Sequence, residues 1–278
     1  MSAAIAAAGE INMRTFARRI GVVGCGIAAW SASGQITLVS DQRAVTVEAA
    51  GQVQFAFPSP AYSAFNRDLN RNVPSGGGTG IARAQQTSSI STSAMNAVGL
   101  VRAESNAGPS NCILSQSTSD FRVLFTVPAI VRFQATGDVT GAQFRLGSNA
   151  DGTIALVESL DTTTLAIATT KVLRPGRTYT LLAQASDLTS ACNGGTVVLT
   201  GSYNLSATFA TVTPCPGDLN FDGLVDDSDF TIFAGAYNDL LCAPPPTFCD
   251  ADLNSDSVVD DVDFVIFAAS YNDLICPE

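Results

Sequence analysis

The chain has 278 residues, of which 46% are apolar, with a mean hydropathy of +0.24 and a net charge of −11, as in globular proteins of one or two domains. Its charge is segregated, because residues 215–278 hold 13 Asp, one Glu and no Lys or Arg, whereas residues 1–214 hold 14 basic and 11 acidic residues. Nucleic acid is therefore not an expected partner, since phosphate binding needs clustered basic side chains. The chain has no histidine, which excludes Ser-His-Asp and Cys-His catalysis and His-ligated zinc.

Residues 1–33 have the pattern of a secretory signal peptide. Arg14 and Arg18-Arg19 precede an apolar run at residues 20–30, and small residues follow it. The run is too short to span a bilayer, so we expect secretion, to an extracellular or cell-surface location, without a transmembrane segment. Met13 is an alternative start.

Seven cysteines are distributed along the chain. The first, Cys25, ends a Val-Val-Gly-Cys stretch that resembles a lipoprotein cleavage site, which leaves lipidation at Cys25 as an alternative. Removal of the signal peptide leaves six cysteines, and an even number favours disulfides and an oxidising compartment. We expect Cys112 and Cys192, both within Asn, Ser and Gly turn segments, to join two loops of one domain.

Residues 34–213 alternate apolar and polar side chains over short segments rich in Val, Ile, Thr and Phe. This pattern predicts an antiparallel β-sandwich, with a jelly-roll-like topology. The polar stretch Arg67–Ser93, with glycines at 76–78, is expected to be a long flexible loop. The strands are expected at 35–39, 44–48, 52–57, 121–127, 131–135, 143–146, 154–158, 165–168, 178–183, 196–200 and 203–209.

Nothing in this region forms a recognisable catalytic pairing. A glycoside hydrolase needs only two carboxylates, so that class is not fully excluded. A carbohydrate-binding accessory protein is a further alternative, but the only tryptophan, Trp30, is removed with the signal peptide, and Tyr179 and Tyr203 are expected in the core. The acidic candidates are Asp120, Asp138, Glu158 and Asp187.

Residues 214–278 contain a 28-residue unit twice, beginning at Cys215 and Cys249, with 18 identical positions. Each copy places oxygen-bearing side chains at positions 1, 3, 5, 9 and 12 of a twelve-residue loop, which is the ligand spacing of an EF-hand calcium loop. The backbone carbonyl at position 7 adds another oxygen. The predicted ligands are Asp218, Asn220, Asp222, Leu224, Asp226 and Asp229 in the first loop, and Asp252, Asn254, Asp256, Val258, Asp260 and Asp263 in the second.

We therefore expect two calcium ions per chain. Position 6 of such a loop normally needs glycine for a sharp turn. The first loop has Gly223 there and the second has Ser257, so the second site is expected to be the weaker one.

A short helix with one apolar face is expected after each loop, at i, i+3, i+4 and i+7 spacing. The faces comprise Phe230, Phe233, Ala234, Tyr237 and Leu241 in the first copy, and Phe264, Phe267, Ala268, Tyr271 and Ile275 in the second. A duplicated loop-helix unit without an entering helix resembles the type I dockerin, a calcium-dependent module that attaches secreted proteins to cohesin domains.

The resemblance covers residues 215–278 and implies a cohesin-like partner. It is incomplete, because dockerins carry Ser-Thr at loop positions 10 and 11, where this chain has Asp227-Ser228 and Asp261-Val262. The cohesin contacts are thus not implied residue by residue, and a neighbouring copy of the chain remains an alternative partner.

The resemblance also implies how four cysteines pair. A helix of about 12 residues is about 18 Å long and carries Cys242 away from Cys215, whereas a disulfide needs Cα atoms within about 7 Å. Because dockerin helices pack antiparallel, we expect Cys215–Cys276 and Cys242–Cys249. Altogether the sequence predicts a secreted, non-catalytic adhesion or structural protein that docks through its C-terminal module.

Overall fold

The computed structural model describes residues 35–212, 215–220, 224–239, 249–254, 256 and 258–273. The expected signal peptide, including Met13 and Cys25, lies outside these residues. In the described part of the chain, no helix is long and apolar enough to cross a membrane. The strands are β1 (Thr37–Asp41), β2 (Ala44–Ala49), β3 (Gln52–Ala56), β4 (Phe65–Ser75), β5 (Gly78–Ile90), β6 (Ala94–Asn106), β7 (Cys112–Thr126), β8 (Val131–Thr140), β9 (Ala142–Ser148), β10 (Gly152–Glu158), β11 (Thr164–Leu173), β12 (Thr178–Cys192) and β13 (Thr196–Thr211).

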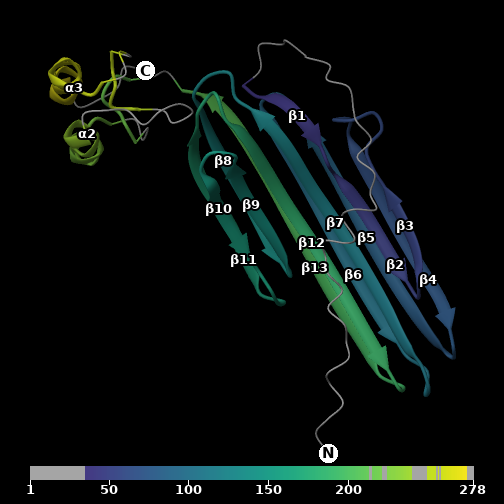
Figure 1. The fold of residues 1–278 in the computed structure, drawn as a ribbon. Coiled ribbons are helices and arrows are strands. Elements are labelled where there is room, and N and C mark those ends of the chain that lie inside the picture. The colour runs from purple at the N-terminus through teal and green to yellow at the C-terminus, as the bar shows by residue number, and fades with distance from the viewer. Residues whose placement is uncertain are drawn as a thin grey trace, which may run out of the picture. The chain divides into compact units, whose positions relative to one another are not determined.

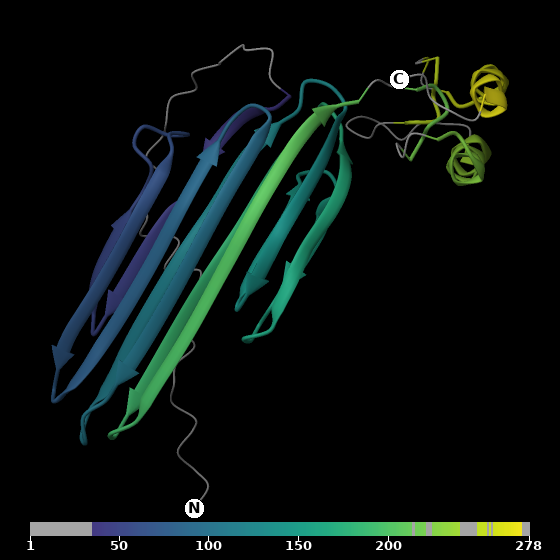
Figure 2. The ribbon, with the colours of Figure 1, turned by 180° about the vertical axis from the view of Figure 1, so that it is seen from behind.

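These strands form two antiparallel sheets that pack face to face (Figures 1 and 2). We call them sheet A, in the order β10-β9-β12-β7-β2-β3 with β1 also paired to β7, and sheet B, in the order β11-β8-β13-β6-β5-β4. The predicted β-sandwich is therefore confirmed. The two segments expected at 196–200 and 203–209 are one continuous strand, β13.

The central strands follow the period of two that a half-buried sheet requires. In β7 every second residue from Ile113 to Phe125 is buried, and β13 shows the same alternation from Gly201 to Phe209. Aromatic rings fill one part of the interior: the ring centroid of Phe209 lies 5.2 Å from that of Phe125 and 5.4 Å from that of Phe133. Tyr179 is buried there as expected, with its ring stacked 5.6 Å from Phe125.

The expectation of a flexible loop at Arg67–Ser93 is wrong. Residues 67–90 belong to a hairpin of β4 and β5, which turns at Gly76 and Gly77, and both glycines have positive φ values. The following strand β6 was not foreseen either. The inward positions of β5 are Ala82, Ala84, Gln86 and Ser88, so the strand buries small and polar groups and lacks the apolar alternation that marks its neighbours.

The interior beside this hairpin is lined by small residues and hydroxyl groups. Ser115, Ser117 and Ser119 of β7 are buried, and Tyr203 is buried with its hydroxyl 3.0 Å from Ser119 Oγ and 3.1 Å from the donor Gln86 Nε2. A Cβ atom at Gly99 would lie 2.3 Å from the Tyr203 ring, so only glycine fits under that ring. Burial raises the pKa of Tyr203, since the phenolate would lose its hydration.

A buried ion pair between Asp41 and Arg43 lies at the turn between β1 and β2. Arg43 donates through Nε and Nη2 to the two carboxylate oxygens of Asp41, at 2.8 and 2.6 Å, and neither side chain is exposed. The same guanidinium donates to Ser88 Oγ and to the Ser63 carbonyl, at 3.0 and 2.8 Å. One arginine thus joins the β1–β2 turn, β5 and the segment before β4.

The predicted disulfide between Cys112 and Cys192 is confirmed. The two cysteines are register partners at the ends of β7 and β12, so the bond closes neighbouring strand ends where loops had been expected. Around it, Ala107 donates its N–H to the Gly195 carbonyl and Gly194 donates to the Gly108 carbonyl, each at 2.9 Å. The loops that cross between the sheets at this end are therefore tied together.

Candidate metal centre

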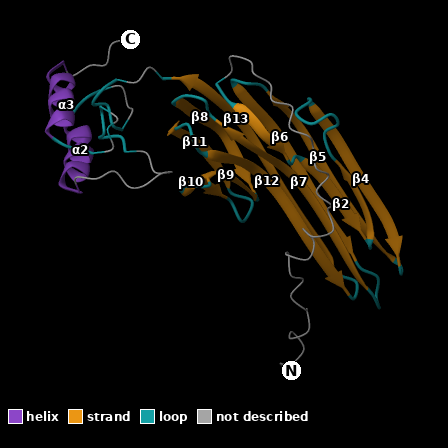
Figure 3. Cartoon of the chain, turned by 45° about the horizontal axis from the view of Figure 1, so that its top comes forward, coloured by secondary structure: helices purple, strands orange, loops and turns teal. Residues whose placement is uncertain are grey.

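The two C-terminal helices are α2 (Asp227–Asp239) and α3 (Asp261–Asp273), shown in purple in Figure 3. Each begins directly after an aspartate whose side chain caps it: the Ser228 N–H donates to Asp226 Oδ1 at 2.8 Å, and the Val262 N–H donates to Asp260 Oδ1 at 2.9 Å. Further aspartates occupy both first turns, where the helix dipole favours negative charge.

The aspartate at position 12 of each loop is fully buried and organises the loop. Asp229 Oδ1 accepts the N–H groups of Leu219 and Asn220, at 2.7 and 2.9 Å, and its Oδ2 accepts that of Asp226 at 3.0 Å. A carboxylate on the helix thereby holds both the start and the end of the loop.

Asp263 repeats this arrangement in the second copy. It accepts the N–H groups of Leu253, Asn254 and Asp260 at 2.7, 3.0 and 3.0 Å. The two predicted loops therefore share one hydrogen-bonded framework, and sequence spacing alone had assigned these aspartates only as metal ligands.

Three of the predicted ligands converge in the second loop. Carboxylate oxygens of Asp252, Asp256 and Asp263 lie within 4.8 Å of one another. Oxygens that share one calcium ion at 2.3–2.6 Å can be at most about 5 Å apart, so the spacing fits a common ion. All three donors are hard oxygen atoms, which is the donor type that calcium selects.

The other ligands of the second loop lie beside this cluster. Asn254 Oδ1 accepts the Asp256 N–H at 2.9 Å, and the Asn254 amide donates to Asp256 Oδ2 at 2.9 Å. Val258 forms a single-residue β-bridge, as does Leu224 at the same position of the first loop. Ser257, expected to weaken this site, lies outside the described residues.

The first loop is described in part. Asp218 is buried, Asn220 is half-buried and Asp226 caps α2, while Asp222 and Gly223 lie outside the described residues. The described residues of both loops donate equivalent N–H bonds to Asp229 and Asp263.

A small apolar core joins the two copies. It is formed by Leu219, Val225, Phe233, Ala251, Val259 and Phe267. The rings of Phe233 and Phe267 stack with centroids 4.9 Å apart. The expected apolar faces are only partly right, because Phe230 and Phe264 are 46% and 44% exposed. Leu241 and Ile275 lie outside the described residues.

Two reciprocal hydrogen bonds cross between the copies. The Tyr237 hydroxyl donates to Asp261 Oδ1 and the Tyr271 hydroxyl donates to Asp227 Oδ1, both at 2.5 Å. Each tyrosine thus reaches the first helical residue behind the other loop. The hydrogen bond to the neighbouring carboxylate, together with its negative charge, raises the pKa of both tyrosines.

The four cysteines around the repeats are described in part. Cys215 and Cys249 are disulfide-bonded, and both pack against the apolar core. Their expected partners, Cys276 and Cys242, lie outside the described residues, so the pairing stays a prediction.

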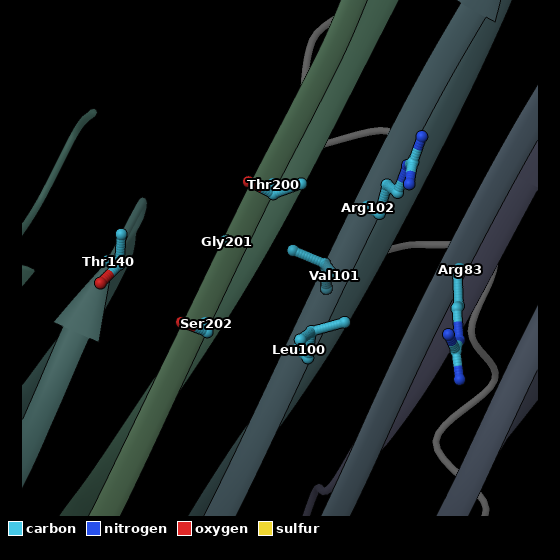
Figure 4. Close-up of a pocket in the computed structure, with 8 residues that line it drawn as sticks. All are labelled: Arg83, Leu100, Val101, Arg102, Thr140, Thr200, Gly201 and Ser202. Carbon is cyan, nitrogen blue, oxygen red and sulfur yellow. The ribbon is translucent and has the colours of Figure 1, made fainter. Parts of the chain in front are cut away.

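A shallow hollow of about 400 Å³ lies on the outer face of sheet B (Figure 4). It is lined by Arg83, Leu100, Val101, Arg102, Thr140, Thr200, Gly201 and Ser202. Both guanidinium groups already have carboxylate partners, since Arg83 pairs with Asp68 at 2.8 Å and Arg102 with Glu104 at 2.6 Å. No carboxylate, and no nucleophile with a neighbouring base, is among the lining residues.

The sequence had singled out four acids in the sandwich, and two of them have raised pKa values. Burial raises the pKa of both Asp120 and Asp187 to about 6. Asp120 belongs to the outward-facing set of β7, whereas Asp187 points between the sheets from β12, so the two do not form a pair. Asp138 lies on β8 of sheet B and Glu158 on the edge strand β10 of sheet A.

No protein-family model matches the chain, and no curated protein matches it. Four chains of solved structures match, among them a GH31 alpha-xylosidase from Xanthomonas citri. That match has 9% identity and a TM-score of 0.19, and it covers 66% of this chain and 32% of the xylosidase chain. This chain thus spans about a third of the xylosidase's length, and a likeness of this size carries no argument about fold or function.

Proposed function

We propose that the protein is a secreted, non-catalytic attachment protein whose C-terminal repeats bind two calcium ions and dock, like a dockerin, onto a cohesin-like domain or a neighbouring copy. The observation that carries the proposal is the convergence of Asp252, Asp256 and Asp263 in a loop with calcium-binding spacing. Bound calcium would neutralise carboxylates that otherwise repel one another. The Cys112–Cys192 disulfide supports an oxidising compartment.

The surface of α3 supports docking through that helix. Val262 and Val265 are 54% and 67% exposed and lie one helical turn apart, whereas the equivalent positions of α2 hold Ser228 and Thr231. At these two positions α3 is apolar where α2 is polar, and this difference favours a protein partner on that part of α3.

Calorimetric titration of the metal-free full chain with calcium tests the metal sites. Two sites are expected in the wild type and one in Asp263→Asn, because that change removes a ligand from the second loop. Asp261→Asn is the matched control, since Asp261 lies at position 10, outside the ligand set, and should leave two sites. Failure of the wild type to bind calcium would refute the proposal.

Capture of secreted proteins of the source organism on the immobilised chain, in calcium and then in chelator, tests docking. Val262→Asp with Val265→Asp should abolish calcium-dependent capture. Ser228→Asp with Thr231→Asp adds the same charge to α2 and should not. Equal capture by both double variants would show that docking does not use α3.

Carbohydrate binding is a second candidate, because two aromatic rings are exposed side by side. Phe55 and Phe57 are 62% and 42% exposed, with ring centroids 5.4 Å apart, beside Thr46 and Glu48 of the neighbouring strand β2. Aromatic faces and polar groups together can receive the apolar face and hydroxyls of a sugar. A glycan array probed with the wild type and with Phe55→Ala/Phe57→Ala would show ligands that the variant loses.

A further inference from the structure

The outer face of sheet A carries an exposed aromatic ring at one edge and hydroxyl groups directly beside it. Phe55 of β3 is the register partner of Thr46 on β2, and Thr46 is the partner of Thr118 on β7. Register partners in an antiparallel pair point to the same face, so these three side chains form a row across three strands. The hydroxyl oxygens of Thr118 and Ser186 lie 3.1 Å apart, and the row therefore continues onto β12.

A second row runs beside the first. Two residues farther along β2 and β7, Ala44 and Asp120 are register partners. Phe57 lies just past the last residue pair of β2 with β3, level with Ala44, and its ring centroid is 5.4 Å from that of Phe55. Neighbouring strands are about 4.8 Å apart, so about 10 Å separates the backbones that carry Phe57 and Asp120. The small methyl group of Ala44 stands between them, so a ring-shaped ligand over Ala44 can contact both.

Asp120 and its neighbour Arg122 have hydrogen-bonding atoms that are left unused. Asp120 Oδ1 and Arg122 Nε have no hydrogen-bond partner among the described residues, and the two side chains are joined by an ion pair of 3.5 Å. The Asp120 side chain is 19% exposed, and the broad torsional range of its last bond lets either oxygen turn outward. Unpaired polar atoms shielded from water cost free energy. A ligand that donates a hydroxyl group to Asp120 would offset part of that cost.

The two rows place aromatic and polar groups side by side in one patch. We call this the outer patch, and it comprises Ala44, Thr46, Phe55, Phe57, Thr118 and Asp120. The C–H groups of a sugar ring pack on the negative face of an aromatic ring, while its hydroxyl groups bond to threonine and carboxylate oxygens. A protein interface would instead have an apolar centre and polar groups at its rim. Because polar groups here begin directly beside the rings, the patch favours a sugar.

We propose that the outer patch binds a neutral glycan, with one sugar ring over Ala44 between Phe57 and Asp120. Glu48 lies on the same face of β2 and adds a second carboxylate, whereas Arg122 offsets only one of the two negative charges. Carboxylates accept hydrogen bonds from sugar hydroxyl groups and repel the carboxylate and sulfate groups of acidic glycans. The inference rests on the carbohydrate-binding candidate above, to which it adds the ligand class and the residues that select it. It is independent of the calcium sites.

Binding of the calcium-loaded full chain to immobilised neutral, uronate-bearing and sulfated polysaccharides tests the ligand class. The wild type is expected to bind neutral ones only. Calorimetric titration with an oligosaccharide of the bound polysaccharide then measures the affinity of variants. Ala44→Leu should weaken binding at least about tenfold, because the larger side chain occupies the position of the sugar ring. Asp120→Asn is nearly isosteric and should weaken binding about tenfold through loss of a charged acceptor.

Sheet B offers a matched control for both variants. Ala166 on β11 and Asp138 on β8 are also register partners, and both point to the outer face of that sheet, without aromatic rings beside them. Ala166→Leu and Asp138→Asn should therefore bind the glycan like the wild type.

The outcomes separate this inference from the carbohydrate-binding candidate. If no polysaccharide binds, both fail. If Phe55→Ala/Phe57→Ala abolishes binding while Ala44→Leu and Asp120→Asn leave it unchanged, the candidate stands and the inference is overturned. A preference for acidic polysaccharides, or an equal loss of affinity in the sheet B controls, would overturn the inference as well.

Discussion

The sandwich and the C-terminal repeats hold their chains together by different means. The sandwich surrounds a continuous interior of aromatic and aliphatic side chains, with one described disulfide at its edge. The described core of the repeats has six buried apolar residues, and the loops are organised by the carboxylates of Asp229 and Asp263. Apolar burial can stabilise the sandwich without a ligand. A core as small as that of the repeats normally needs disulfides or a metal. The comparison predicts that the two regions respond to different perturbations.

The largest expected effect is in the sandwich, at its buried ion pair. Arg43→Ala leaves the Asp41 carboxylate buried and without its guanidinium, and it should cost about 3–5 kcal/mol of unfolding free energy. The matched control is Arg102→Ala, whose ion pair with Glu104 is exposed and should contribute less than about 1 kcal/mol. Urea unfolding followed by near-UV circular dichroism measures both. Similar losses in the two variants would contradict the assigned role of Arg43.

Calcium removal should destabilise the C-terminal repeats and not the sandwich. If calcium is present at 100 times its dissociation constant, each site stabilises the repeats by about 2.7 kcal/mol. Chelator should therefore lower the unfolding temperature of the repeats and leave that of the sandwich unchanged. Scanning calorimetry with and without chelator resolves the two transitions. A calcium-dependent shift in the sandwich transition would show that the regions are not independent.

A smaller effect, which raises the free energy of unfolding, is expected for a substitution inside the sandwich. The pKa of Asp187 is raised to about 6 by burial, so its charged form disfavours the folded state. Its contribution to stability is complete below the unfolded pKa of about 4 and is lost as the pH rises through about 6. Asp187→Asn should stabilise the sandwich by about 1 kcal/mol at pH 7 and by much less at pH 4. Chemical unfolding at both pH values checks the sign, and Glu158→Gln, at an exposed position of β10, serves as the control.

The smallest expected effect concerns the crossed tyrosines of the repeats. Tyr237→Phe and Tyr271→Phe each remove one exposed hydrogen bond to an aspartate and should lower the unfolding temperature of the repeats only slightly. The pKa of both tyrosines is raised, so this stabilisation is present below the unfolded pKa of about 10 and is lost as the pH rises through the folded value. The ultraviolet titration of the wild type minus that of each variant isolates the tyrosine that the variant lacks from the four others in the chain. Titration of either at an ordinary tyrosine pKa would argue against the crossed bonds.

Sequence patterns predicted most strands where buried positions are large and apolar. They failed at β5, whose inward residues are Ala82, Ala84, Gln86 and Ser88, because small and polar groups give no hydrophobic period. That strand is buried only because sheet A lies over it, which is a long-range property. The partners of Arg43 were missed for the same reason, since Ser88 is 45 residues away in sequence.

The predicted calcium loops depend on local spacing, and for that reason the sequence could place their ligands. It could not show that Asp229 and Asp263 also accept three backbone N–H groups each, because such bonds depend on how the loop folds back on its helix. The crossed bonds of Tyr237 and Tyr271 depend on how the two repeats of the chain pack against each other. Sequence spacing contains no information about which tyrosine faces which carboxylate.

The chain leaves the sandwich from the end of β13 and continues into the repeats. This strand is hydrogen-bonded to β6 from Thr196 to Thr208 and to β8 from Ser202 to Thr211, so its last part has a neighbour on both sides. A tensile force applied to the repeats would enter the sandwich along β13 and slide the strand lengthwise between its neighbours. Many hydrogen bonds would then have to break together instead of one after another. A protein anchored by its C-terminal end would thus resist being pulled apart by flow through a strand that is hydrogen-bonded to neighbours on both sides.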